Sequence, residues 1–194
     1  LLNEIGKEIE ENMSSYEIEL NNKIFKIKPV RSLCGHKINK YKIHADKVIP
    51  NIYIKDYTKR MSSDEFYAVE TFATTGTGNT YEDIEDCSHF MVNYNKEIKK
   101  IDIPNNSNQM YKLILKYYNT LAFADRWLMG KNLIKNNKKK LLEMKNVNKY
   151  LNNLCKSLII NKYPPIYDYD KKSYSSQFEE TIYIMENETK LLSK

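Results

Sequence analysis

The sequence contains little glycine, proline, cysteine or histidine, and only some of these shortages are informative. Glycine and proline occur five times each, in a chain rich in Lys, Asn, Ile and Tyr. That bias is typical of an AT-rich genome and carries no functional meaning. The three cysteines are widely spaced and form no CxxC pair, which argues against a disulfide scaffold and against a thiolate zinc site.

Long apolar runs are also missing. No stretch approaches the roughly 20 apolar residues of a membrane span, and no charged-then-apolar signal segment is present. The expectation is therefore a soluble cytoplasmic protein with no membrane partner. With 194 residues, 41% of them hydrophobic, the chain is long enough for one domain with a buried core.

Basic residues exceed acidic ones by 31 to 25, but they are spread along the chain. The densest cluster, residues 136–140, is more typical of a solvated loop or a helix start than of a nucleic-acid groove. DNA is not an expected partner.

Strand patterns dominate both ends of the chain. Alternation on either side of Asn21-Asn22 predicts a β-hairpin over residues 16–28, because Asn tolerates the left-handed backbone of a tight turn. An amphipathic helix precedes it over residues 5–13. Aromatic and β-branched residues predict four further strands, at residues 41–45, 48–52, 65–75 and 174–185.

Helical patterns occupy the middle of the chain. Apolar residues recur every three or four positions over residues 108–129, where Gly130 supplies a stop. A second helical stretch covers about residues 139–160, before Tyr163-Pro164-Pro165 ends it. Strands that flank an inserted helical block predict an α+β fold.

Three residues far apart in the chain suit a metal site: His36, Glu70 and Glu179. Gly35 would allow a backbone turn to hold the His36 imidazole at a pocket edge. Glu70 stands in an otherwise apolar strand centre, where a lone buried carboxylate needs a metal or another cation. The alternative is that Glu70 points to solvent, and alternation alone does not exclude it.

Two carboxylates and one imidazole suit Mn, Co, Fe or Zn and a metal-activated water. Spacing alone is weak evidence, since no HExxH-type signature is present. The surrounding motifs carry more information. In order they are Gly35-His36, Tyr41-Lys42-Ile43-His44-Ala45, Ala68-Val69-Glu70-Thr71-Phe72, Thr75-Gly76-Thr77-Gly78, Asp86-Cys87-Ser88-His89, Asn119-Thr120-Leu121-Ala122-Phe123, Tyr163-Pro164-Pro165 and Gln177-Phe178-Glu179.

Together these motifs resemble the C-terminal part of type 2 methionine aminopeptidases. The resemblance implies the C-terminal half of a pita-bread fold with two divalent metal ions, and removal of the initiator Met from nascent chains. It implies that His36, Glu70 and Glu179 are metal ligands, with Glu179 bridging both ions. Glu70 would also shuttle a proton, and His44 would bind substrate and stabilise the tetrahedral intermediate.

The resemblance further implies that Ile43, His89, Ala122 and Tyr163 line the pocket for the Met side chain. A structural role near the helical block is an equal alternative for His89. Residues 1–89 and 163–194 would form the catalytic part, and residues 90–162 the inserted helical subdomain of type 2 enzymes.

Two aspartate ligands of the family belong to a segment before Leu1. The isolated chain is therefore expected to be inactive and to need its own N-terminal portion. Expected partners are nascent-chain N-termini with Met before a small residue, and the ribosome. Two other readings are a non-enzymatic pita-bread relative that binds ribosome or RNA, and a proline-specific peptidase. Retention of the ligand residues disfavours the first, and the helical block disfavours the second.

Overall fold

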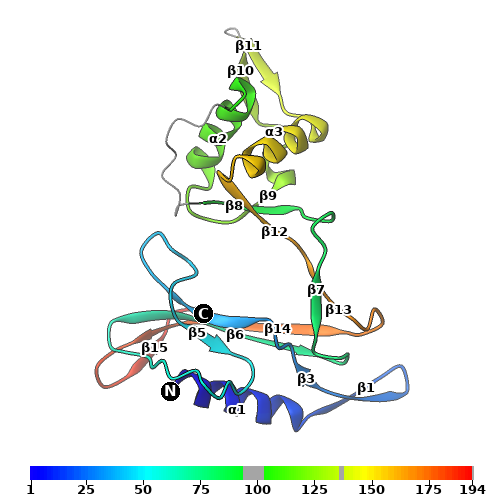
Figure 1. The fold of residues 1–194 in the computed structure, drawn as a ribbon, viewed down its shortest axis with the longest axis vertical. Coiled ribbons are helices and arrows are strands. Elements are labelled where there is room, and N and C mark those ends of the chain that lie inside the picture. The colour runs from blue at the N-terminus through cyan, green and yellow to red at the C-terminus, as the bar shows by residue number, and fades with distance from the viewer. Residues whose placement is uncertain (94–102, 136–137, 194) are drawn as a thin grey trace. The chain divides into compact units, whose positions relative to one another are not determined.

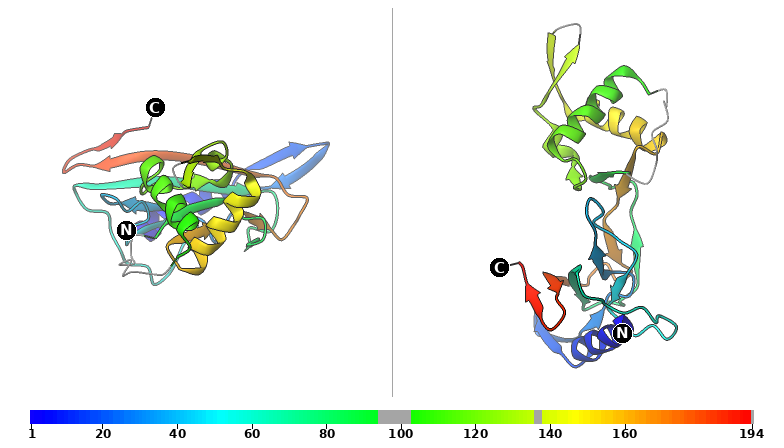
Figure 2. Two further views of the ribbon diagram at one scale, coloured as in Figure 1. Left: turned by 90° about the horizontal axis from the view of Figure 1, so that it is seen from above. Right: turned by 90° about the vertical axis from the view of Figure 1, so that its left-hand side faces the viewer.

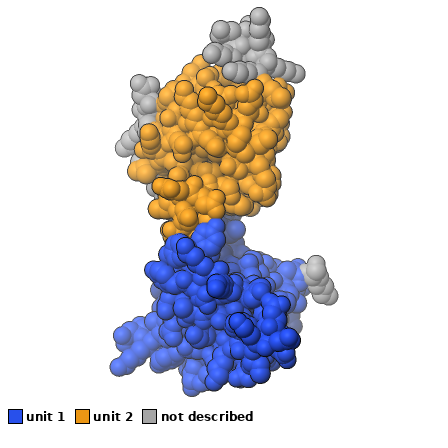
Figure 3. All heavy atoms as spheres, turned by 90° about the vertical axis from the view of Figure 1, so that its right-hand side faces the viewer, with its two compact units in different colours: residues 1–81, 166–194 blue, residues 82–165 orange. Residues whose placement is uncertain are grey.

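A computed structural model describes residues 1–93, 103–135 and 138–193 of the chain. They divide into two compact units (Figure 3). Unit 1 comprises Leu1–Tyr81 and Ile166–Lys194, and unit 2 comprises Glu82–Pro165. The predicted division into residues 1–89 with 163–194 and residues 90–162 stays a prediction about family architecture.

A six-stranded sheet forms the centre of unit 1 (Figure 1). Its strand order is β15-β14-β6-β4-β5, with β3 also paired to β6. The strands are β3 (Lys28–Pro29), β4 (Cys34–Ile38), β5 (Val48–Pro50), β6 (Glu65–Thr74), β14 (Ser175–Ile184) and β15 (Thr189–Leu191). The two longest, β6 and β14, pair antiparallel along their full length, so segments far apart in the sequence lie side by side.

Helix α1 (Leu2–Ser14) packs on one face of this sheet, as Figure 2 also shows. Its Leu2 side chain is buried in a core with Ile49 and Tyr67, and Val69 and Ile182 pack against that core. Side chains alternate between faces along a strand. Since Tyr67 and Val69 face the helix, Ala68 and Glu70 face the opposite way.

The close approach of strands β4 and β6 explains why position 35 is a glycine. A Cβ atom at this position would lie 2.5 Å from the Ala68 carbonyl oxygen and 2.8 Å from the Glu70 amide nitrogen. Gly35 lies within strand β4 and its φ is not positive. The expectation that Gly35 makes a turn is therefore wrong, and the residue instead lets β4 pack closely over β6.

The predicted hairpin over residues 16–28 is confirmed by β1 (Glu17–Leu20) and β2 (Lys23–Lys26). Asn21 and Asn22 form its turn with φ angles of 52° and 59°, as a two-residue hairpin requires.

The chain passes between the units through β7 (Thr80–Glu82) and β13 (Ile166–Asp168), which pair with each other.

In the described part of unit 2, two helices, a short 3₁₀ helix and small sheets surround an apolar core. The elements of this unit are β8 (His89–Val92), α2 (Asn105–Tyr117), β9 (Phe123–Ala124), η1 (Asp125–Leu128), β10 (Asn132–Lys135), β11 (Lys138–Leu141), α3 (Met144–Lys156) and β12 (Ile160–Tyr163). Strands β12, β8 and β9 form one sheet, and β10 and β11 form a hairpin. Met110 and Ile114 from α2 meet Leu151 and Leu154 from α3 in the core.

Several sequence predictions of elements need correction. The strand expected at residues 41–45 is a loop, because Tyr41 has a φ of 59° and Asn39 and Lys42 exchange hydrogen bonds across a tight turn. The helix expected over residues 108–129 ends at Tyr117. Asn119, with a φ of 49°, supplies the left-handed residue that ends the helix twelve positions early.

The second predicted helix, residues 139–160, is also too long. It begins at Met144, since Lys138–Leu141 is a strand, and it ends before Leu158, whose φ is 56°. The loop or helix start expected at residues 136–140 is a strand from Lys138 onward, and residues 136–137 lie outside the described residues. The strands expected at residues 48–52, 65–75 and 174–185 are confirmed as β5, β6 and β14.

The three cysteines, Cys34, Cys87 and Cys155, are free thiols. No helix in the described ranges is both long and apolar enough to cross a membrane.

Candidate metal centre

Three neighbouring strands place His36, Glu70 and Glu179 on the sheet face opposite α1. Glu179 on β14 is the direct cross-strand partner of Glu70 on β6. His36 on β4 pairs with Ala68, which lies two residues from Glu70 and therefore on the same face. Antiparallel pairing thus gathers three positions that are far apart in the sequence. Strand register is what brings them together.

The closest contact within this group joins His36 and Glu70. The His36 Nε2 atom lies 3.0 Å from the Glu70 Oε1 atom, and the two side chains are only 8% and 15% exposed. The Glu70 carboxylate therefore turns toward the imidazole and away from solvent. Two ligands of one divalent metal, each about 2.0–2.2 Å from the ion, have a similar mutual separation.

Gln177 connects the two carboxylates. Its side-chain nitrogen donates to the Glu70 Oε2 atom at 3.4 Å and to the Glu179 Oε2 atom at 3.3 Å. These two long hydrogen bonds place a neutral donor where the carboxylates converge. A cation would satisfy the same oxygen atoms more strongly.

The charges of this cluster shift three pKa values. Burial alone would lower the pKa of His36, but hydrogen bonds to Glu70 and to the backbone raise it overall. Desolvation and then the negative charge of Glu70 raise the pKa of Glu179. Desolvation and then the neighbouring His36 lower the pKa of His44. The raised pKa of Glu179 reflects burial and a neighbouring like charge, which a bound cation would offset.

His44 lies beside the cluster on the loop between β4 and β5. Its ring meets the His36 ring edge-on, with centroids 4.3 Å apart and an interplanar angle of 73°. The loop is held at both ends, since the Ala45 amide donates to the Lys37 carbonyl at 2.9 Å and Lys47 binds Glu65 at 2.6 Å. Ile43, next to His44, is 36% exposed.

The donor set fits part of a divalent metal site. An imidazole and two carboxylates are ligands that such ions accept. Over residues 1–93, 103–135 and 138–193, however, no three His, Cys, Asp or Glu side chains are arranged as a complete metal-binding group.

The other predicted pocket residues belong to unit 2. His89 on β8 is the cross-strand partner of Tyr163 on β12 and also of Ala124 on β9. Ala122 lies immediately before β9. His89 and Tyr163 therefore lie side by side at one end of a small sheet, whereas Ala122 lies further along it, beyond the Phe90–Phe123 pair. The role of all three residues in binding Met stays a prediction.

Two residues on the strands that carry the cluster were not predicted from the sequence, and only the first of them lies on the cluster's face of the sheet. One is Gln177, whose amide bridges the carboxylates. The other is Glu65, which is 8% exposed and accepts hydrogen bonds from Lys37, Lys47, Tyr67 and the Ser62 amide. Glu65 could have been noticed from the sequence as a charged residue at the start of a largely apolar strand.

Comparisons with known proteins give one consistent family. The chain is 40% identical over 193 residues to methionine aminopeptidase 2A of Arabidopsis thaliana, which covers 98% of this chain and 40% of the relative. It is 39% identical to methionine aminopeptidase 2 of Dictyostelium discoideum, over 100% of this chain and 40% of that protein. The Encephalitozoon intestinalis enzyme of the same name is 38% identical over 98% of this chain and 49% of its own length.

The chain therefore spans less than half the length of these curated relatives. Among solved structures, that of a thermophilic Arx1 matches 85% of this chain and 40% of its own, with a TM-score of 0.67 and 15% identity. That likeness shows a shared fold with mixed helices and sheet. A scan against models of protein families finds no match.

Proposed function

We propose, from the premise that this chain belongs to the methionine aminopeptidase 2 family, that it carries part of an active site that removes the initiator Met from nascent proteins. The observation that supports this most strongly is the shared sheet face of His36, Glu70 and Glu179. The remaining ligands, two aspartates in the family, would come from the part of the family's length that this chain does not cover.

In this proposal His36, Glu70 and Glu179 would be this chain's ligands to the divalent ions. Mn, Co, Fe and Zn all suit this donor set. When bound, such ions polarise a carbonyl group and activate water. The burial of His36 and Glu70 supports a ligand role, because a buried carboxylate needs a positive partner.

Glu70 and His44 would act on protons and on the substrate. A carboxylate at the centre of the cluster can take a proton from the attacking water and return it to the leaving amine. His44 has a lowered pKa, so its imidazole is neutral near pH 7 and can donate one N–H to the carbonyl oxygen of the substrate. Its edge-on contact with His36 limits the orientations of the ring.

The same proposal assigns a role to each unit, a substrate and a partner. Unit 1 would be the C-terminal half of a pita-bread fold, and unit 2 the inserted subdomain of type 2 enzymes. Substrates would be nascent N-termini in which Met precedes a small residue. Ile43, His89, Ala122 and Tyr163 would contact the Met side chain. The ribosome would be a further partner.

A binding-only relative is the alternative from another class. The retained set of His36, His44, Glu70 and Glu179 favours the enzyme, since a protein that only binds has no need for a buried imidazole–carboxylate pair. The Arx1 match supports the fold and carries no functional argument at 15% identity.

The test uses mass spectrometry to measure the release of Met from a Met-Ala-Ser peptide by the intact protein. We expect metal-dependent release that EDTA abolishes, and at least a hundredfold loss in His36→Ala. Lys23→Ala, a change on the exposed β2 strand, is the control and should keep full activity. Full activity in His36→Ala would refute the ligand assignment.

A substrate panel separates the neighbouring specificities. Met-Ala-Ser, Leu-Ala-Ser and Ala-Pro-Ser peptides are compared at equal concentration. Preference for the Met peptide supports the proposal, and preference for the X-Pro peptide would assign the site to a proline-specific peptidase.

A further inference from the structure

The net positive charge of the chain is concentrated in unit 2. Residues 82–165 contain 15 Lys and Arg against 8 Asp and Glu, whereas the rest of the chain contains 16 and 17. Unit 2 therefore accounts for the whole net positive charge of the chain. Such an asymmetry favours an acidic binding partner.

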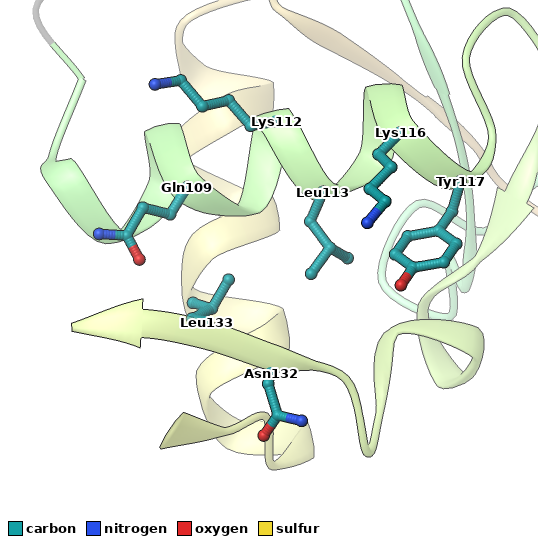
Figure 4. A pocket seen from close by; sticks show the side chains of 7 residues that line it. All are labelled: Gln109, Lys112, Leu113, Lys116, Tyr117, Asn132 and Leu133. Carbon is teal, nitrogen blue, oxygen red and sulfur yellow. The ribbon is translucent and has the colours of Figure 1, made fainter. Parts of the chain in front are cut away.

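An open pocket of about 420 Å³ lies on this basic unit, between α2 and β10. Figure 4 shows Leu113 from the helix and Leu133 from the strand pointing into the same space, with Lys116 extending beside the Tyr117 ring. We call this site the lysine groove. It is lined by Gln109, Lys112, Leu113, Lys116, Tyr117, Asn132 and Leu133.

Cations surround the apolar floor of the groove. Lys112 and Lys116 are one helical turn apart on the exposed side of α2. The Lys131 ammonium lies 4.0 Å from the centroid of the Tyr117 ring, and the Lys116 ammonium lies 5.4 Å from it. None of these three lysines has an acidic partner in the ion pairs of the described residues.

The groove also contains an acceptor that needs a donor. The Gln109 Oε1 atom is buried and accepts no hydrogen bond from any described residue. The other end of the same amide donates to the Asn105 side chain at 3.5 Å. A buried acceptor without a donor costs about 1–3 kcal/mol, so rotation of this amide toward a ligand N–H in the groove would be stabilising.

These features fit an acidic peptide better than RNA. Leu113 and Leu133 offer an apolar floor to a Leu or Trp side chain, which a phosphodiester backbone cannot use. Among the described lining residues, Tyr117 alone has an aromatic ring, and the Lys131 ammonium lies over that ring. Tyr117 is 53% exposed, but the ammonium groups of Lys131 and Lys116 lie over its ring, so a base would have to displace a lysine to stack there. A peptide supplies carboxylates for the lysines and a backbone N–H for Gln109.

We propose that the lysine groove binds an acidic segment of a partner protein, with an apolar side chain between Leu113 and Leu133 and carboxylates on Lys112 and Lys116. This site is independent of the aminopeptidase function proposed above, because no residue of the metal cluster takes part in it.

The experiment is fluorescence anisotropy with the intact protein and a labelled peptide, Glu-Asp-Leu-Glu-Glu-Trp-Leu-Asp-Glu. We expect saturable binding, weakened at least tenfold in Lys112→Glu/Lys116→Glu. The matched control is Lys145→Glu/Lys149→Glu, because these exposed lysines have the same spacing on α3 and lie outside the groove. It should bind within twofold of the wild type.

A second variant tests the orphan acceptor. Gln109→Leu should raise the Tm of the free protein, since it removes a buried unsatisfied oxygen, and should weaken the peptide about fivefold, which corresponds to the loss of about one hydrogen bond.

Four results would overturn the proposal. They are an absence of saturable binding, equal weakening by both double lysine variants, equal binding of a peptide with Ser in place of Leu and Trp, and stronger binding of oligouridine RNA than of the peptide. The last two would make the groove a general polyanion site.

Discussion

Asp168 holds the loop after β6 in place, and its replacement by Asn tests how. The carboxylate is 9% exposed. It accepts hydrogen bonds from the Thr77 amide and hydroxyl at 3.0 and 2.9 Å, and from the Gly78 and Asp170 amides at 3.0 and 2.8 Å. Gly76 lies so close that a Cβ atom there would be 2.7 Å from the carboxylate. Asp168→Asn keeps the shape and removes the charge.

The magnitude follows from the pKa of Asp168. Although burial alone would raise it, the backbone donors lower the pKa from 3.8 to about 2. That difference is worth roughly 2–3 kcal/mol of stability at neutral pH. Because the folded pKa is the lower one, this contribution is complete above the unfolded value of 3.8 and is lost as pH falls through about 2. We expect Asp168→Asn to cost roughly 2–3 kcal/mol at pH 7.

The assay is urea unfolding of the intact protein at pH 7, 5 and 3, followed by amide hydrogen exchange of a peptide that covers residues 74–80. The difference between the wild type and Asp168→Asn should be constant from pH 7 to 5 and smaller at pH 3. Asp170→Asn removes the same charge from an exposed neighbour and should change stability by less than about 0.5 kcal/mol. An equal loss in both variants, or a pH-independent difference, would refute the reasoning.

Two further predictions concern the strands that carry the metal cluster. Glu65 pairs with Lys37 and Lys47, and its pKa is lowered to about 2. Glu65→Gln should therefore lower the free energy of unfolding at pH 7 by about 3 kcal/mol, measured by chemical denaturation. A loss below about 1 kcal/mol would contradict a buried ionic network. Gly35→Ala should abolish Met release and lower Tm, because the added Cβ would lie 2.5 Å from the backbone of β6. The control is Gly130→Ala, whose added Cβ meets nothing within 4 Å and which should cost only about 1 kcal/mol of stability for its left-handed backbone. Equal effects of the two glycine variants on activity would contradict the close packing of β4 and β6.

Sequence periodicity predicted the parts of the fold in which local pattern and tertiary packing agree. Strands β6 and β14 are long and contain several aromatic and β-branched residues, and the Asn21-Asn22 turn has one strong signal. The overlong helix after residue 108 shows the limit. Apolar residues continue at helical spacing beyond Tyr117, but Asn119 adopts a left-handed conformation and the same residues then form β9 and η1. Tertiary packing overrode the helical pattern there.

The candidate site was predictable in its residues and not in its arrangement. The motifs identified His36, Glu70 and Glu179, but only the register of three strands places them on one face. Gly35 shows the same limit, since the sequence suggests a turn and the structure requires close strand contact. The bridging role of Gln177 depends on its position two residues before Glu179, on the same side of β14.

Measuring the metal content of ligand variants tests the central claim most directly. The intact protein, Glu179→Gln and Glu180→Gln are loaded with Mn²⁺, desalted and analysed by inductively coupled plasma mass spectrometry, and Met release is measured on the same samples. Glu180 is the adjacent carboxylate, and it faces the other side of the sheet. The account predicts that Glu179→Gln loses bound metal and activity together while Glu180→Gln keeps both. Full metal content in Glu179→Gln, or equal loss in the two variants, would contradict it.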